Sequence, residues 1–297
     1  MVVKGNADLK ATLSHKGARF GLCRRAWLHT SARMKKIIKR FKSKPTVPVI
    51  RLNGVIGGGS RLGGPGLNDA ALAPVIERAF SKGKPKAVAL VINSPGGSPV
   101  QSALIAARIR RLADEKEIKV YAFCEDVAAS GGYWLATCAD EIYVDGSSII
   151  GSIGVISASF GFNELMERQG IERRVYTAGE DKSMLDPFRP AKDEDIERVK
   201  GLQKVIHDSF IGQVTSRRGD RIVGKNLFTG DIWVGAQAVE NGLVDGIGHL
   251  VPKMKELFGE DVRLPVHGPK RSLLSKFGAA SVISDVEDRL NWSRFGL

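Results

Sequence analysis

The chain has 297 residues, of which 43% are hydrophobic and 26% charged, and its 45 Lys and Arg against 32 Asp and Glu give a formal net charge of +13. Such a composition excludes an intrinsically disordered or fibrous protein. Residues 1–44 hold 13 of the basic residues and one of the acidic ones, so residues 45–297 are close to neutral and give no reason to expect nucleic acid as a partner.

Residues 1–44 form a basic leader with three open interpretations. Residues 1–33 are basic, rich in Ser and Thr and poor in acids, which is typical of a mitochondrial transit peptide and implies a location in the matrix. Alternatively, the natural start is Met34 in an over-long gene model. As a third option, the basic run at residues 35–42 makes peripheral contact with anionic lipid, for a cytoplasmic protein at the inner membrane face. No apolar run reaches the roughly 18–20 residues of a transmembrane helix.

From residue 45 onward, short apolar runs alternate with amphipathic stretches. This alternation predicts βαβ units around a buried parallel sheet, hence an α/β fold. We divide the chain into the leader (1–44), one main domain (45–258) and a C-terminal arm or tail (259–297). Residues 57–66 read as a glycine-rich loop and residues 225–258 as a helix-rich unit. Strands are expected at 46–52, 87–92, 119–124, 141–144, 153–156 and 172–176, and helices at 68–80, 100–114, 128–138, 163–169 and 193–218.

Two of the expected strands lead into glycine-rich turns. Residues 93–97 read Asn-Ser-Pro-Gly-Gly, and Gly96 and Gly97 allow the positive φ that turns N–H groups into a cleft, where they can hold an oxyanion. A plain β-turn explains the same letters. The second turn places the hydroxyl of Ser130 before Gly131 at a helix start, where the helix dipole stabilises a developing anion. An ordinary N-cap serine gives the same pattern.

A nucleophilic serine needs a base. The histidines of the body have no Asp or Ser companion in the sequence, so we expect them to be structural or surface residues: His207, His249 and His267. A lysine serves instead if burial lowers its pKa. Lys182 lies near the apolar Met184, Leu185 and Phe188, which would exclude water, whereas a solvated loop lysine is the alternative. Cys124 and Cys138 read as small buried residues, and no Cys/His spacing indicates a metal site.

Four motifs, in order, resemble the signal peptide peptidase A (protease IV) family of serine peptidases, peptidase family S49, in its short single-domain form. They are residues 93–97, residues 129–133 (Ala-Ser-Gly-Gly-Tyr), residues 151–155 (Gly-Ser-Ile-Gly-Val) and Lys182. The resemblance covers roughly residues 47–250. It implies a ClpP/crotonase-like superhelix of βαβ units with a helical C-terminal part, and ring-like homo-oligomers whose neighbouring subunits complete the cleft. Many members carry an N-terminal membrane anchor, which this sequence does not show.

Carried over to this chain, the resemblance makes Ser130 the nucleophile and Lys182 the general base. The backbone N–H groups of Gly97 and Gly131 become the oxyanion donors, with Gly96 in the same substrate-binding turn. The implied activity is an endopeptidase that cleaves signal-peptide remnants or unfolded protein segments and needs no metal or organic cofactor.

Two alternatives share the implied superfold. A crotonase-like enzyme acting on an acyl-CoA thioester would use a similar oxyanion site, but it would need a carboxylate acid or base in the cleft. A catalytically inactive scaffold, assembling with a membrane partner, would keep the fold without the chemistry. Nucleic-acid binding would rest on the leader alone.

Overall fold

The structure is a computed structural model that describes residues 44–57, 66–179, 182–268 and 295. The chain divides into two units, Met1–Lys44 and Pro45–Leu297, and everything below concerns the second. The interpretations of the leader up to residue 43, and of the tail at 269–294 and 296–297, fall outside the described residues. Among the described residues, no helix has the length and hydropathy needed to cross a bilayer.

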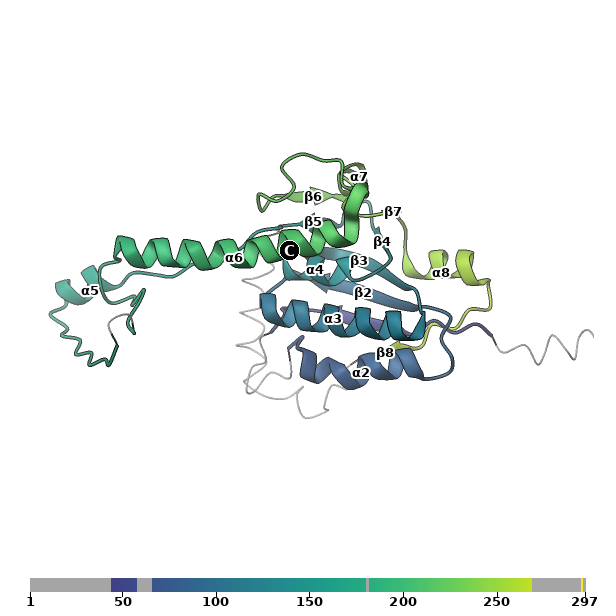
Figure 1. The fold of residues 1–297 in the computed structure, drawn as a ribbon, viewed down its shortest axis with the longest axis horizontal. Helices are drawn as coiled ribbons and strands as arrows, with labels where there is room; N and C mark the ends of the chain where they lie inside the picture. Colours follow the sequence, from purple (N-terminus) through teal and green to yellow (C-terminus); the bar gives the residue numbers. More distant parts are fainter. Residues whose placement is uncertain (1–43, 58–65, 180–181, 269–294, 296–297) are drawn as a thin grey trace, which may run out of the picture. The chain divides into compact units, whose positions relative to one another are not determined.

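The second unit is built on one eight-stranded sheet, which confirms the α/β class (Figure 1). The strand order is β6-β5-β3-β2-β1-β8, and β4 and β7 branch from β3. Among these described strands, every pairing is parallel except that of β5 with β6. The strands are β1 (Val49–Asn53), β2 (Val88–Ser94), β3 (Val120–Ala129), β4 (Glu141–Val144), β5 (Ile149–Gly151), β6 (Ile232–Val234), β7 (Gly246–Ile247) and β8 (Val266–His267).

Helices cover both faces of the sheet. The larger core lies under α2 (Asp69–Ser81), α3 (Pro99–Lys116), α4 (Gly131–Thr137) and the C-terminal end of α6 (Asp193–Arg218). The smaller core lies on the opposite face and is closed by α8 (Leu250–Phe258). Two covered faces explain the unbroken apolar run of β2, since a strand buried on both sides has no polar alternation. The remaining helices are α5 (Asn163–Arg168), the 3-10 turn η1 (Gly219–Arg221) and α7 (Gly235–Glu240).

Strand β3 changes neighbours along its length, and this change sets up the site. Its residues 121–124 pair with β4, whereas residues 127–129 pair with β5. On its other side, Ile92 of β2 pairs with Cys124, and the next pair joins Ser94 to Ala128. One residue of β2, Asn93, therefore faces three of β3, so β3 bulges at residues 125–127. The redirected end of β3 leads directly into Ser130.

Three expected elements differ from the structure. The strand expected at 153–156 lies earlier, as β5, and Ile156 is 70% exposed with no described strand beside it. Residues 172–176 form no strand, because no strand of the described chain pairs with them. The helix expected from residue 128 starts at Gly131, because the backbone of residues 127–129 is taken by the ladder with β5. In the last case sheet pairing outweighs the helix propensity of two alanines.

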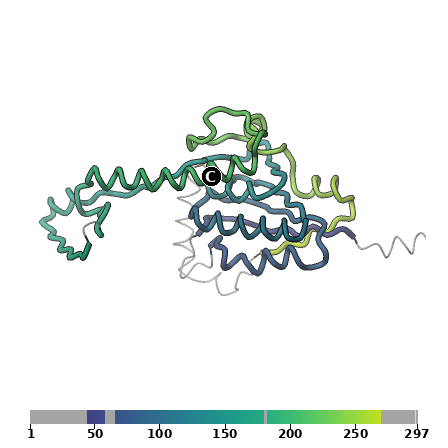
Figure 2. The backbone as a smooth tube through the Cα atoms, in the orientation of Figure 1, coloured from purple at the N-terminus to yellow at the C-terminus, as the bar shows by residue number. Residues whose placement is uncertain are grey.

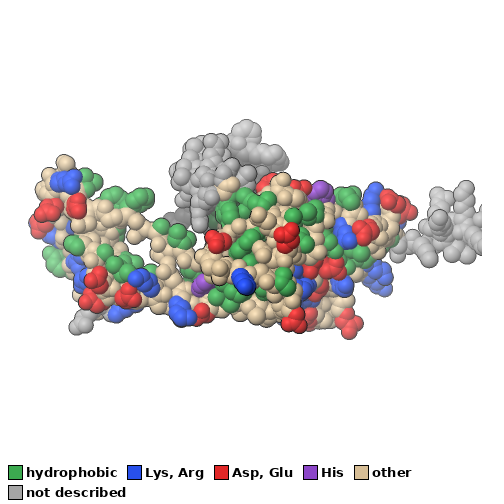
Figure 3. All heavy atoms as spheres, turned by 90° about the horizontal axis from the view of Figure 1, so that it is seen from above, with side chains coloured by type: hydrophobic (Ala, Val, Ile, Leu, Met, Phe, Trp, Pro, Cys, Tyr) green, Lys and Arg blue, Asp and Glu red, His purple; other side chains and the backbone are tan. Residues whose placement is uncertain are grey.

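The chain leaves the sheet after β5, runs out through α5 and returns along α6 (Figure 2). We call residues 156–192, without the undescribed 180–181, the Lys182 segment. The buried residues of α6 all lie towards its C-terminal end, where the helix meets the sheet. Hydrophobic side chains lie open on the surface of the Lys182 segment (Figure 3), namely Ile156, Phe160, Leu165, Ile171 and Tyr176.

Candidate active site

Ser130 stands alone between the end of β3 and the start of α4, in an unusual backbone conformation. Its φ is +52° and its ψ is −122°, a combination that a non-glycine residue adopts only under constraint. The constraint comes from both sides, since its N–H donates to Gly151 O at 2.8 Å and its carbonyl accepts from Trp134 N at 3.0 Å. The side chain makes no capping hydrogen bond to α4. The alternative of an ordinary N-cap serine is therefore wrong.

The turn after β2 packs directly against Ser130. Gly96 and Gly97 have φ of +104° and +140°. A Cβ on Gly96 would lie 2.8 Å from the Cβ of Ser130, and one on Gly97 would lie 2.2 Å from the carbonyl oxygen of Ile56. Only glycine fits at either position, because both backbones approach too closely for a side chain. The plain β-turn alternative leaves this close approach to Ser130 unexplained.

The backbone N–H groups of Gly97 and Gly131 lie in the same neighbourhood. A Cβ on Gly131 would be 3.4 Å from the nitrogen of Gly97. The Gly97 N–H donates to no acceptor among the described residues, and Gly131 is the first residue of α4, where the N–H has no partner within the helix. Both amides are thus available to a ligand.

A cavity of about 590 Å³ opens beside Ser130. Its walls come from the turn after β2, from Ser130, and from the loops that follow β5 and precede β6. Ser152 in the wall has a φ of +50°, and its N–H donates to Asp231 O at 2.7 Å. Ser152 belongs to the motif at residues 151–155 that carries part of the family resemblance. No motif or pattern in the sequence marks Thr229, which comes from a distant part of the chain.

Lys182 lies elsewhere in the single chain. It is exposed, and it lines neither this cavity nor the smaller one described below. The expected apolar neighbour Phe188 instead packs within the Lys182 segment, where it stacks on Phe162 with ring centroids 5.7 Å apart and lies under the guanidinium of Arg173 at 4.6 Å. The structure therefore brings Ser130, Gly96, Gly97 and Gly131 together, and leaves Lys182 apart from them within one copy.

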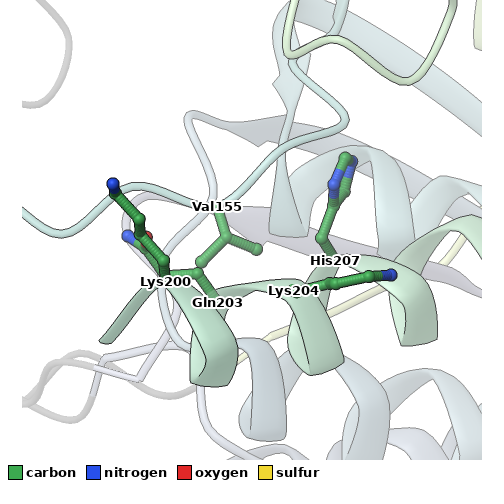
Figure 4. A pocket seen from close by; sticks show the side chains of 5 residues that line it. All are labelled: Val155, Lys200, Gln203, Lys204 and His207. Atoms are coloured by element: carbon green, nitrogen blue, oxygen red, sulfur yellow. The ribbon is translucent and has the colours of Figure 1, made fainter. Parts of the chain in front are cut away.

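A second cavity of about 230 Å³, whose lining side chains are drawn in Figure 4, shares Val155 with the first. Its other lining residues all come from α6: Lys200, Gln203, Lys204 and His207. Lys200 pairs with Glu197 at 2.8 Å and Lys204 with Asp208 at 2.7 Å, so their charges are largely compensated. His207 Nε2 lies 3.0 Å from Ile153 O, which ties α6 to the loop after β5.

The other potential bases and nucleophiles named from the sequence do not reach Ser130. His249 pairs with Asp145 at 2.8 Å on the surface, a companion that the sequence spacing did not reveal. Cys124 and Cys138 are buried, as expected, and burial raises the pKa of each thiol to about 12. Such thiols stay protonated at neutral pH and are inert.

Comparison with known proteins assigns the family. A sequence model of Peptidase family S49 matches residues 113–258, a range that contains Ser130 and Lys182. A Synechocystis protein that carries a protease name is 30% identical over 210 residues, which cover 70% of this chain and 72% of that protein. This chain belongs to peptidase family S49. The family that the four motifs indicated is thereby confirmed.

Two further relatives of this S49 chain are much longer proteins. Serine protease SPPA, chloroplastic, of Arabidopsis thaliana is 32% identical over 215 residues, which are 69% of this chain and 31% of that protein. The Na(+)/H(+) antiporter NhaA of Brucella melitensis is 50% identical over 247 residues, which are 82% of this chain and 33% of that protein. The chain thus spans about a third of each. Most of the protein that bears the antiporter name lies outside the match.

Proposed function

We propose that this S49 member is a serine endopeptidase with a Ser130–Lys182 dyad, built on a ClpP/crotonase-like superhelix. The observation that carries the proposal is Ser130 itself. It is held at a strained φ, its hydroxyl does not cap α4, and it lies in the wall of a 590 Å³ cavity against two glycine amides. Backbone strain of this kind costs about 1–3 kcal/mol and persists where a site depends on it.

The proposed reaction follows the chemistry of these groups. Neutral Lys182 takes the proton of Ser130 as its oxygen attacks a peptide carbonyl, and the N–H groups of Gly97 and Gly131 hold the resulting oxyanion. Each such donor is typically worth about 10²–10³ in rate. Protonated Lys182 then gives its proton to the leaving amine, and water hydrolyses the acyl-enzyme with Lys182 again as base.

We further propose that Lys182 reaches Ser130 of a neighbouring copy in a ring-like homo-oligomer. Within one chain Lys182 is exposed and lines no part of the Ser130 cavity. The apolar side chains on the Lys182 segment, such as Phe160 at 79% and Tyr176 at 90% exposure, support a contact with another subunit that covers them. The fitting substrates are extended peptides, such as signal-peptide remnants or unfolded segments, because an extended backbone presents its carbonyls to a cleft of this kind.

Two variants test the dyad and its placement together. We expect Ser130→Ala and Lys182→Ala each to abolish cleavage of an unfolded peptide mixture, mapped by mass spectrometry, while leaving the oligomer intact. A mixture of the two inactive variants, after subunit exchange, should regain about one quarter of wild-type activity, since head-to-tail contacts pair subunits at random. Full activity of either single variant would refute the dyad. No recovery after verified exchange would place the lysine in the same chain as its serine.

A serine-reactive probe separates this proposal from its alternatives. We expect the probe to label Ser130 in the wild type and not in Ser130→Ala. A crotonase-like acyl-CoA enzyme needs a carboxylate in the cleft, and none of the described residues that line the cavity is an aspartate or glutamate. An inactive scaffold would neither be labelled nor cleave. For the leader, the two proposals to separate are a natural start at Met34 and a mitochondrial transit peptide at residues 1–33. N-terminal sequencing of the native protein tests them, and a mature start upstream of Met34 would refute both.

A further inference from the structure

The bulge in β3 leaves a gap in the ladder between β2 and β3, three residues before Ser130. Regular pairing ends at Ile92 with Cys124 and resumes at Ser94 with Ala128. Backbone N–H and C=O groups inside such a gap have lost their ladder partners, and in a buried strand they need replacements. The N–H of Val127, whose side chain is fully buried, is one of them.

The side chain of Asn93 fills this gap. Its Oδ1 accepts from the N–H of Val127 at 3.1 Å, and its Nδ2 donates to Oδ2 of Asp126 at 2.6 Å. Both halves of the amide are therefore used on two successive residues of the bulge. A carboxamide suits this position because it offers one acceptor and one donor side by side, whereas a carboxylate offers acceptors only.

The opposite side of the bulge is held by another side chain. Ser148, which is 1% exposed, donates to Glu125 O at 2.6 Å and accepts from Asp145 N at 2.9 Å. This side chain fixes the bulge to the turn between β4 and β5. Asn93 instead connects the bulge to β2, and β2 continues directly into the turn that carries Gly96 and Gly97.

We propose that Asn93 is a positioning residue for the reaction. Its amide fixes the end of β3, and hence Ser130, relative to the turn after β2, so that the serine oxygen and the Gly97 N–H keep the spacing that attack requires. This inference rests on the proposed function of Ser130 and Gly97. Loss of this connection would misalign the end of β3 and the turn after β2. A misplacement of about 1 Å at a reacting centre can lower the rate on the order of 100-fold.

A swap of donor and acceptor tests the proposal. Asn93→Asp sets two carboxylates against each other and removes the donor, and we expect kcat to fall about 10–100-fold with KM within about twofold. Adding Asp126→Asn restores both hydrogen bonds, because the carboxylate introduced at position 93 would accept from Val127 N–H and from the new amide. The double variant N93D/D126N should recover kcat to within about threefold of wild type.

The matched control is N93D/E125Q, which has the same net charge as the rescued double variant. Glu125 is the neighbouring acid and pairs with Arg51 at 3.2 Å on the surface, so its replacement leaves the gap unfilled. We expect this control to stay as slow as N93D. Rates are measured well below the melting temperature of each variant, so that partial unfolding does not enter kcat.

Three results would overturn the proposal: unchanged kcat in N93D, equal recovery in the control, or an Asn93→Ala variant that melts lower while keeping its kcat. Asn93→Ala also serves if N93D fails to fold. A wild type that neither cleaves peptides nor reacts with the serine probe would instead refute the proposed function. In that case, the hydrogen bonds of Asn93 are tested by thermal unfolding. Adding D126N to N93D should restore the melting temperature, and adding E125Q should not.

Discussion

Substitution of Gly97 by alanine tests the oxyanion role of its amide. The added Cβ would lie 2.2 Å from the carbonyl oxygen of Ile56, whereas ordinary contacts begin at 3.4 Å, so the turn must shift by about 1.2 Å. That shift also disrupts the bridge in which Ile56 N donates to Gly96 O and Ser98 N donates to Ile56 O, each at 2.8 Å. A movement of this size removes the N–H from the position of the oxyanion. We expect kcat/KM to fall about 10²–10³-fold.

The assay compares this variant with Gly83→Ala. Gly83 also has a positive φ, +79°, but a Cβ there meets nothing within 4 Å, so it carries the backbone strain without the collision. Strain at positive φ costs roughly 1–3 kcal/mol, and both variants should show it in urea unfolding. Only Gly97→Ala should lose peptide cleavage and the labelling of Ser130 by a serine-reactive probe. Equal activity in the two variants would refute the reasoning.

Three further predictions concern the surroundings of the site. The side chain of Arg218 is 2% exposed and donates to Asp245 Oδ2 at 2.8 Å and to Gly242 O at 2.9 Å. Arg218→Met should therefore lower the free energy of unfolding in urea by about 3 kcal/mol, and a decrease below about 1 kcal/mol would contradict a buried pair. Burial acts to raise the pKa of Asp245, but hydrogen bonds from Arg218 and the Ile142 N–H outweigh it and hold the pKa below the ordinary 3.8. Stability from this pair is thus present at neutral pH and lost as the pH falls below 3.8, and the Arg218→Met variant should show a flatter acid limb in unfolding from pH about 5 to 3. His207→Ala should cleave peptides at a rate within about threefold of wild type, because the ring contacts Ile153 O and lines only the second cavity. A loss of activity as large as that of Lys182→Ala would instead identify His207 as the general base.

The strands of the sheet and the larger helices could be predicted from the sequence, because each is marked by a pattern within its own residues. The apolar run of β2 and the cap at Asn68, whose Oδ1 accepts from Ala71 N at 2.9 Å, are local signals with local causes. The glycines at 96, 97 and 131 were also predictable as a group, since close backbone approach has no substitute for glycine.

The features that could not be predicted from the sequence depend on contacts between residues that are distant in the chain. Val155 and Ile156 look like a strand, but strand formation needs a neighbour, and no strand of the described residues pairs with them. The bulge in β3, and the position of Thr229 in the cavity wall, can be predicted only when the pairing register of the strands is known. Lys182 is an extreme case, because in the proposed assembly its role would depend on a second copy of the chain, and one sequence holds no information on contacts between copies.

The separation of Ser130 and Lys182 within one chain has a consequence for when activity begins. On the proposed assembly, a newly made subunit holds every reactive group and yet no working site, so it is latent without a propeptide. In that proposal, assembly would replace the proteolytic activation of a zymogen. Activity per subunit would then fall steeply on dilution and return on concentration, and unassembled chains would cleave nothing in the cell.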